Sequence, residues 1–301
     1  MSTCESDRVK EQIIPLFGLG IAHSRAPMLH NFIFAKLGLP WKYVLFDSDN
    51  VESFKENYYD DFFACAVTMP NKIIMTQHVD SVDEGAVAVG AINTIYSRTI
   101  DGNKVKIGTN TDTIGIRDAI LFNSPQISIE RAKGKPGLVY GGGGASRSAV
   151  YALVEYLGCS KVYIINRFKQ EVESLEKSMV EGGFKGQILH VETPEQAQNL
   201  EVPNLIVCTI PDFAPTTLEE IRAKSTLDVF KKNGDGVVLE MCYHPNPKTR
   251  LYQEFQESNW FVISGIEAMI YQAFAQQVLW TGYNMKELHT KEAIEYVHNN
   301  L

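Results

Sequence analysis

The chain has 301 residues, a length that predicts two domains, each large enough to bury a hydrophobic core of its own. Hydrophobic residues make up 45% of the sequence and charged residues 21%, values that are ordinary for a soluble globular protein. The formal net charge of −8 argues against a nucleic-acid partner attracted by overall charge, so an anionic ligand must be met by specific local donors.

The cysteines and the N-terminal segment bear on redox state and location. The cysteines number five, an odd count, and are scattered, with three in apolar strand-like runs, which favours buried free thiols over disulfides or a metal site. Residues 1–12 lack the apolar core of a signal peptide, and no apolar run approaches the length that spans a bilayer. We therefore expect a cytoplasmic protein without a metal, a nucleic-acid partner or a membrane contact, and leave monomer and homodimer open.

The first predicted elements are a strand and a helix joined by a polar turn. Residues 14–21 form an apolar run, and residues 28–37 carry apolar side chains at helical spacing, with Pro27 well placed at the helix start. Ser24 lies in the turn, where a serine most often caps a helix. The same place suits a second role, because free N–H groups and the helix dipole favour a carboxylate at a helix start.

One lysine and one aspartate stand among small and turn-forming residues in the next segment. Lys72 comes just after a short apolar strand at residues 64–69, and Asp112 follows the second of two strands predicted at residues 91–98 and 104–110. Because α/β sheets bind ligands at the C-terminal ends of their strands, these ends predict a polar pocket. The simpler interpretation is that Lys72 is a solvated surface residue and that Asp112 caps a turn or helix.

A glycine-rich turn follows residues 123–136, which lack periodicity and mark the expected domain boundary. The sequence there predicts an apolar strand, four glycines, a helix at residues 145–157 and a second strand, which is the βαβ context of a dinucleotide fingerprint. Gly141 permits the tight turn, and Gly143 lets the backbone approach a pyrophosphate held by the helix N-terminus. Ser146 replaces the third glycine, so the motif is imperfect.

Asn166 and Arg167 occupy the position, about 20 residues beyond the glycines, that contacts the adenosine ribose in dinucleotide-binding folds. A carboxylate there would bond the ribose hydroxyls and repel a 2′-phosphate, whereas Arg167 would stack on the adenine or pair with the phosphate. The sequence therefore predicts NADP as the cofactor, with NAD possible. The alternative is that Arg167 only ends a strand at the surface.

The C-terminal part continues the alternation of strands and helices. Residues 266–280 have apolar side chains on one face, which predicts an amphipathic helix. Gln272 lies beside that apolar stripe. Other glutamines of this helix, Gln276 and Gln277, are expected in solvent, as helix glutamines usually are.

Several motifs resemble the signature of the shikimate dehydrogenase family. AVTMPNK, GAINT and GTNTDTIG are similar to the family blocks NVTxPxK, GAxNT and NTDxxG, and further similarities extend from Ser24 to Gln272 over nearly the whole chain. In that family the lysine and aspartate that match Lys72 and Asp112 form the catalytic pair. The resemblance therefore implies the same role for both residues here. His23 and His30 also match the family pattern, and we expect both to be structural.

The residues and the resemblance together predict two sets of binding residues. The substrate-binding set is Ser24, Thr68, Asn93, Tyr243 and Gln272. The cofactor-binding set is Gly141, Gly143, Gly144, Ala145, Ser146, Asn166, Arg167, Lys169, Thr209 and Gly265.

Four positions depart from the family pattern. Ala26 replaces the second of two serines that hold the substrate carboxylate, and Ala66 stands where the family usually has asparagine. Phe168 replaces a threonine beside Arg167, with Lys169 as a substitute donor. Glu240 replaces an aspartate in a block similar to DxxYxP that contains Tyr243.

The expected fold is α/β with two domains. An N-terminal substrate domain, residues 1–120, is joined by C-terminal helices at 266–301, and residues 121–265 form a Rossmann-like dinucleotide-binding domain. The resemblance implies hydride transfer between NADP(H) and a ring alcohol of a shikimate- or quinate-like hydroxy acid. A dehydrogenase with a different small hydroxy-acid substrate and a non-catalytic sensor of the same fold are the alternatives, and the presence of both Lys72 and Asp112 argues against the sensor.

Overall fold

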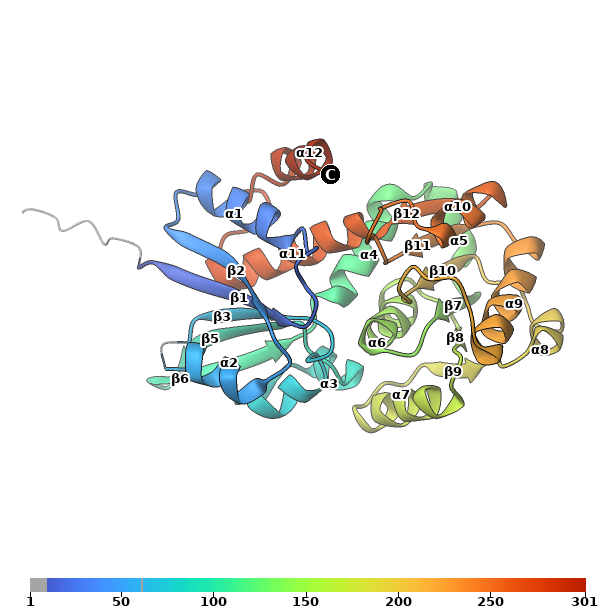
Figure 1. Cartoon of the computed structure of the whole chain (residues 1–301), viewed down its shortest axis with the longest axis horizontal. Coiled ribbons are helices and arrows are strands. Elements are labelled where there is room, and N and C mark those ends of the chain that lie inside the picture. The colour runs from blue at the N-terminus through green and yellow to red at the C-terminus, as the bar shows by residue number, and fades with distance from the viewer. Residues whose placement is uncertain (1–9, 61) are drawn as a thin grey trace, which may run out of the picture.

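Two six-stranded sheets with helices packed around them make up the α/β architecture of the computed structural model (Figure 1). The structure describes residues 10–60 and 62–301, so the predictions for Cys4 and the rest of the first nine residues lie outside the described part. Among the described residues, the strands of the first sheet end by residue 109 and those of the second begin at residue 136. The predicted fold class is confirmed, and the domain limits at residues 120 and 265 stay a prediction.

The first sheet is mixed. Its strands are β1 (Gln12–Gly18), β2 (Trp41–Asp47), β3 (Ala64–Val67), β4 (Ser81–Val82), β5 (Thr94–Ile100) and β6 (Asn103–Thr109). They lie in the order β2-β1-β3-β5-β6-β4. β1 pairs in parallel with β2 and β3, whereas β5 runs antiparallel to β3 and β6.

The second sheet is parallel throughout. Its strands are β7 (Pro136–Tyr140), β8 (Lys161–Ile165), β9 (Gln187–His190), β10 (Leu205–Cys208), β11 (Val237–Glu240) and β12 (Phe261–Ser264). They lie in the order β12-β11-β10-β7-β8-β9, the doubly wound order of dinucleotide-binding folds. The order reverses between β7 and β10, and such a switch point opens a crevice at the C-terminal ends of the strands.

Helices connect the strands and pack on both sheets. They are α1 (Ala26–Lys36), α2 (Val51–Tyr58), the 3₁₀ helix η1 (Ile74–His78), α3 (Glu84–Val89), α4 (Asp112–Asn123), α5 (Gln126–Ala132), α6 (Gly144–Tyr151), the π-helical turn η2 (Ala152–Tyr156), α7 (Lys169–Glu181), α8 (Pro194–Gln198), α9 (Leu218–Asn233), α10 (Arg250–Glu257), α11 (Gly265–Thr281) and α12 (Thr290–Asn299). In the described part of the chain, no helix is both long and apolar enough to cross a membrane.

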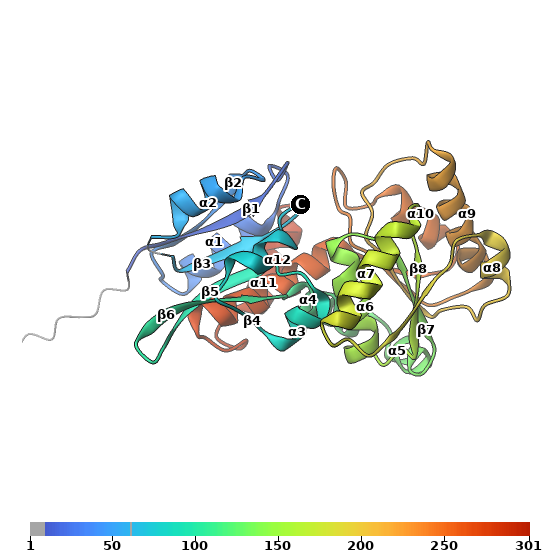
Figure 2. The ribbon, with the colours of Figure 1, turned by 90° about the horizontal axis from the view of Figure 1, so that it is seen from below.

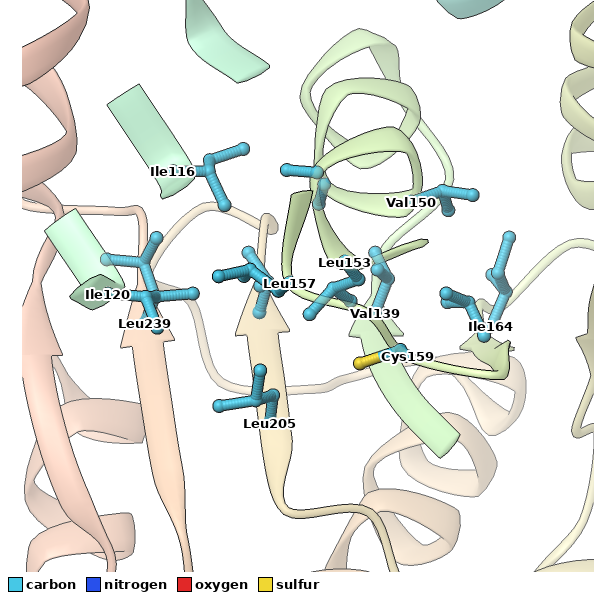
Figure 3. Close-up of a cluster of buried hydrophobic side chains, with 14 of the residues drawn as sticks. Ile116, Ile120, Val139, Val150, Leu153, Leu157, Cys159, Ile164, Leu205 and Leu239 are labelled. Atoms are coloured by element: carbon cyan, nitrogen blue, oxygen red, sulfur yellow. The ribbon is translucent and has the colours of Figure 1, made fainter. Parts of the chain in front are cut away.

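Helix α4 is anchored in the core of the second sheet although it starts at the end of the first. Figure 3 shows Ile116 and Ile120 of α4 in one cluster with Val139, Leu205 and Leu239 of the second sheet. All five side chains are fully buried. The hydrophobic effect therefore ties α4 to the second sheet at a gain of about 1.5–3 kcal/mol for each buried side chain of this size.

Helix α11 connects the sheets in the opposite direction. It begins directly after β12, runs back past α4 and contacts α1 and β5, and α12 then lies beside α1 (Figure 1). A second contact between the two lobes brings α3 close to α7 (Figure 2), where Gly182 lies against the backbone of Val87. The two lobes are thus held together at two separate places.

Gly115 allows α4 and α11 to approach each other closely. A Cβ atom at this position would lie 2.5 Å from the carbonyl oxygen of Ala268 and 2.7 Å from Cβ of Gln272, distances that real side chains do not adopt. The last residue of the GTNTDTIG motif is therefore a packing residue, and it sets the position of Gln272.

Some predicted elements differ from the structure. The segment at residues 123–136, which lacks periodicity and is the expected domain boundary, contains the short helix α5, which buries Ile129 and Ala132. Two apolar contacts are too few to show as periodicity. The helix predicted at residues 145–157 changes to a π-helical turn after Tyr151, and Leu157 N–H donates to the carbonyl of Ala152 at 3.0 Å.

We predict that Gly115→Ala lowers the free energy of unfolding by about 1–3 kcal/mol, the usual cost of overpacking. The added methyl group must push α11 away from α4 and move Gln272, so urea denaturation should show the loss. Gly85→Ala is the matched control, because Gly85 is also helical and a Cβ there would come no closer than 3.5 Å to its nearest neighbours. Equal losses in the two variants would contradict the close-crossing argument.

Candidate active site

A cavity of about 170 Å³ lies at the C-terminal end of β3, between α4 and α11. Its walls come from both parts of the chain, including the loops after β1, β3 and β11. The residues of the predicted catalytic pair and of the predicted substrate-binding set that line it are Ser24, Thr68, Lys72, Asn93, Asp112, Tyr243 and Gln272, which is all of them. Their roles stay a prediction, but the fold brings them to one place.

Lys72 and Asp112 form an ion pair on the wall of this cavity. The Lys72 ammonium contacts Oδ2 of Asp112, and their side chains are only 15% and 10% exposed. The turn that carries Lys72 is fixed, because Asn71 N–H donates to Thr68 O at 2.8 Å and Ile92 N–H donates to Lys72 O at 2.9 Å. The pair is therefore neither the solvated lysine nor the plain helix cap that the simpler interpretation offered.

The other oxygen of Asp112 is held by Asn93. The Asn93 amide donates to Oδ1 of Asp112 at 2.8 Å and to Oε1 of Gln272 at 3.2 Å. The Asn93 carbonyl oxygen accepts from Thr111 N–H at 2.7 Å and from the Thr94 hydroxyl at 2.8 Å. The amide is thus fixed in orientation, and it leaves Oδ2 of Asp112 free for the lysine.

The expectation for the other glutamines of α11 was wrong. Gln276 and Gln277 are fully buried, not solvated. Gln276 Nε2 donates to the Thr94 hydroxyl at 2.9 Å, and Gln277 pairs with Nδ1 of His30 at 2.8 Å. Gln277 follows Ile270 by seven residues and so lies on the apolar stripe, and Gln276 lies at the edge of the stripe, where the first sheet and α1 contact the helix.

The turn before α1 carries Ser24 to the rim of the cavity. Arg25, one residue after Ser24, is the N-cap of α1, and the Ser24 hydroxyl accepts from Ala26 N–H at 3.3 Å. Ser24 also hydrogen-bonds to Tyr243, a bond that lowers the pKa of the Tyr243 hydroxyl, although burial is the larger influence and raises it.

Two further side chains clarify this part of the site. Tyr43 also lines the cavity, a residue that the sequence did not single out and that has no motif to mark it. His30 is completely buried and stacks on Tyr43 with ring centroids 4.3 Å apart, and burial lowers the pKa of His30 to about 3. A neutral imidazole packed between rings fits the structural role expected for it.

A second cavity, of about 310 Å³, lies at the switch point of the parallel sheet. Gly141 has a φ of +134°, a conformation that L residues rarely adopt. A Cβ at Gly143, the N-cap of α6, would meet nothing within 4 Å, which leaves room for a ligand at the first free N–H groups of the helix. Thr209 N–H donates to Tyr140 O at 2.9 Å and closes the opposite wall.

The predicted cofactor-binding residues do not all face this cavity. Those that line it are Gly141, Gly143, Asn166, Arg167 and Thr209, whereas Gly144 and Ala145 form the first turn of α6 and Gly265 lines the first cavity. The Ser146 side chain is buried and bonds to the Thr209 hydroxyl at 2.8 Å. Lys169 is outside the lining and pairs with Glu192 at 3.4 Å and Glu173 at 3.9 Å.

The first turn of α6 lies next to Lys72. A Cβ at Gly144 would lie 3.8 Å from the Lys72 side chain, which is ordinary van der Waals contact. The glycine turn of the second sheet therefore lies directly against the lysine of the first. A dinucleotide on the turn and a small molecule beside Lys72 would be neighbours.

The fold and the two cavities define a two-domain α/β protein with a Rossmann-like dinucleotide-binding lobe. Residues 16–95 match the family described as the shikimate dehydrogenase substrate binding domain. The quinate dehydrogenase of Emericella nidulans is 40% identical over 299 residues, covering 93% of this chain and 90% of that protein. The chain belongs to the shikimate dehydrogenase family.

Other relatives extend the comparison. A pentafunctional AROM polypeptide of Pneumocystis carinii is 35% identical over 272 residues, which are 88% of this chain but only 16% of that protein. The structure of shikimate 5-dehydrogenase from Thermus thermophilus, solved in complex with NADP(H) and shikimate, superposes with a TM-score of 0.70. It is 25% identical and covers 95% of this chain and 100% of that one.

The departure at Glu240 places a buried carboxyl at the end of β11. The side chain is 1% exposed, and burial raises the pKa of the Glu240 carboxyl to about 8, against the opposing effect of Cys242 N–H, which donates to Oε1 at 3.2 Å. Oε2 has no partner among the described residues. Burial therefore favours the protonated form of this carboxyl in the folded chain.

We predict that Glu240 makes the chain less stable as the pH rises. Between its ordinary pKa of about 4.3 and the raised value, the folded state binds a proton that the unfolded state releases, so the free energy of unfolding falls with pH and levels off above the raised pKa. Glu240→Gln keeps the shape of the side chain but removes the titrating group. Urea denaturation from pH 6 to pH 9 should show that the free energy of unfolding of the variant increases relative to that of the wild type as the pH rises. Exposed Glu257→Gln is the control, and parallel curves for Glu240→Gln and wild type would refute the assignment.

Proposed function

We propose that this chain is an oxidoreductase that transfers a hydride between NADP(H), with NAD possible, and a ring carbon that bears a hydroxyl in a shikimate- or quinate-like hydroxy acid. The observation that carries the proposal is the Lys72–Asp112 ion pair on the wall of the first cavity, next to the glycine turn at Gly144. The hydride would come from, or return to, the nicotinamide ring of the bound cofactor.

Lys72 would handle the proton. When a ketone is reduced, its oxygen gains negative charge, and the Lys72 ammonium is placed to stabilise this charge and to donate the proton. In the reverse direction the amine accepts the proton of the hydroxyl. Asp112, with one oxygen held by Asn93 at 2.8 Å and the other against Lys72, would orient the ammonium and balance its charge.

The other lining residues would orient the substrate. Thr68, Asn93 and Gln272 present hydroxyl and amide groups around the ion pair, where the ring hydroxyls would lie. Ser24 and Tyr243 lie together at the start of α1, where the helix dipole favours the substrate carboxylate. This division would place the reacting carbon toward the second cavity and the carboxylate away from it.

The cavity favours a substrate with an additional group near the carboxylate. Ala26 and Ala66 both line it, at positions where the family carries serine and asparagine. The missing side chains leave space in this cavity, which Tyr43 also lines. A quinate-like acid, with a hydroxyl on the carbon that bears the carboxylate, would use this space better than a shikimate-like acid.

The catalytic assignment predicts a large loss of turnover in Lys72→Met. Removing a positioned proton donor should lower kcat at least about 100-fold, while the dissociation constant for NADPH, measured by fluorescence titration, stays nearly unchanged. Asp112→Asn should be similarly harmful, and the double variant should lose much less than the sum because the two residues act as a unit.

Lys42→Met, an exposed lysine on β2, serves as the control and should keep full activity. Near-normal kcat in Lys72→Met, or additive losses in the double variant, would contradict the pair. No turnover of any cyclic hydroxy acid by the wild type, with either cofactor, would favour the sensor alternative.

Substrate choice is tested by Ala26→Ser. Restoring a hydroxyl that donates to the carboxylate adds one charge-assisted hydrogen bond, roughly 10- to 150-fold in affinity, but also fills the space beside the carboxylate-bearing carbon. The variant should therefore improve kcat/KM for shikimate more than for quinate. Steady-state kinetics with both acids checks this, and equal changes for the two substrates would show that Ala26 does not select between them.

A further inference from the structure

The second cavity contains acidic side chains where a 2′-phosphate would be expected to bind. Arg167 lies at the end of β8 and lines this cavity, as the sequence predicted. Glu220, from the first turn of α9, and Glu171, from the first turn of α7, line it as well. Neither glutamate belongs to a motif that the sequence analysis singled out, and the proposed reaction uses neither.

Arg167 is already engaged by one of these carboxylates. Its Nη1 donates to Oε1 of Glu220 at 2.6 Å, and its guanidinium stacks over the ring of Phe168 at 4.9 Å. The two residues are 53 positions apart in the chain, so the pair is a product of the fold. A 2′-phosphate that reaches Arg167 must share the guanidinium with a carboxylate or displace it.

Glu220 is fixed in place by the start of its own helix. Its Oε2 accepts from the backbone N–H groups of Thr216 at 2.9 Å and Thr217 at 3.1 Å, and the Thr217 hydroxyl accepts in return from Glu220 N–H at 3.2 Å. These two backbone bonds lower the pKa of the Glu220 carboxyl to about 2, and Arg167 adds to the effect. The carboxylate is therefore ionised at any working pH and cannot turn away without uncapping α9.

The remaining charges around the cavity do not offset Glu220. Glu171 is anchored by Asn166, whose Nδ2 donates to Oε2 at 2.7 Å. Arg250 also lines the cavity, but its terminal nitrogens donate to Glu254 at 3.1 Å and to the carbonyl of Phe213 at 2.7 Å. Lys169, the substitute donor expected from the sequence, pairs with other glutamates outside the lining.

We propose that Glu220 sets the nucleotide preference of this chain by occupying Arg167, so that the preference for a 2′-phosphorylated dinucleotide is weakened and NAD is accepted alongside NADP. A dianionic phosphate can bind the Arg167 guanidinium only by overcoming the repulsion of the fixed Glu220 carboxylate a few ångströms away. A ribose with two free hydroxyls meets no such repulsion and can donate to Glu220 or Glu171. The inference rests on the proposed function only in requiring a dinucleotide at this cavity.

The test uses nucleotide fragments that lack the nicotinamide, so that it does not depend on turnover. Isothermal titration calorimetry of the full chain with adenosine 2′,5′-bisphosphate and with 5′-ADP gives the ratio of the two affinities. We expect Glu220→Gln to raise this ratio in favour of the 2′-phosphate at least about 10-fold over the wild type, the scale of one charge-assisted hydrogen bond. Glutamine keeps the capping-box pattern. A melting temperature equal to that of the wild type would confirm that α9 is intact in the variant.

Glu219→Gln is the matched control. It removes the same charge one residue earlier on the same helix, but from an exposed side chain, and should change the ratio less than about 2-fold. Arg167→Ala made in the Glu220→Gln chain should abolish the gain, whereas in the wild type it should change the ratio little.

The outcomes separate the inference from the proposed function. An unchanged ratio in a folded Glu220→Gln chain overturns the inference, as would be the case if Arg250 held the phosphate. Equal shifts of the ratio in Glu219→Gln and Glu220→Gln overturn it too. They would indicate a non-specific effect of the net charge of α9 and not of the Arg167–Glu220 pair. Binding of neither fragment to the wild type overturns the dinucleotide site and the inference together.

Discussion

The close crossing of α4 and α11 at Gly115 is the constraint on which the rest of the molecule depends. Both helices belong to two lobes at once: α4 starts at the first sheet and buries Ile116 in the core of the second, while α11 starts at the second sheet and returns to the first. Because a Cβ at Gly115 would overlap Ala268 and Gln272, only glycine permits this contact. The crossing places Asp112, the first residue of α4, opposite Gln272 of α11 and so forms one wall of the cavity.

A charged pair inside such a cavity is stable only if its remaining hydrogen-bonding capacity is satisfied. Asn93 meets this need, since its amide holds one oxygen of Asp112 and its carbonyl accepts from Thr111 and Thr94. The network leaves the face of the Lys72–Asp112 pair open to the cavity and rigid on the protein side. Preorganisation of this kind lowers the cost of reorientation when charge develops on a substrate oxygen.

At the second cavity, a residue that caps a helix also contacts a predicted ligand-binding residue. A capping box stabilises the start of α9 by about 1 kcal/mol, and in this chain its third position is a glutamate. The fold brings that carboxylate, Glu220, within 2.6 Å of Arg167. An arginine that by its position favours a phosphate therefore carries its own counter-charge, and in the proposed dinucleotide site the balance between the two would decide which nucleotide binds better.

The sequence by itself determined the α/β alternation, the glycine turn at Gly141 and the polar residues at the strand ends, because these depend on local periodicity and on backbone conformations that few residues adopt. The resemblance in the motifs then singled out Lys72 and Asp112, which the structure brings into contact. Only the tertiary structure decided that Gln276 is buried and that Glu220 pairs with Arg167. Both facts depend on which elements pack together over long separations in the chain, and a helix pattern does not show whether a polar side chain at the edge of the apolar stripe is buried.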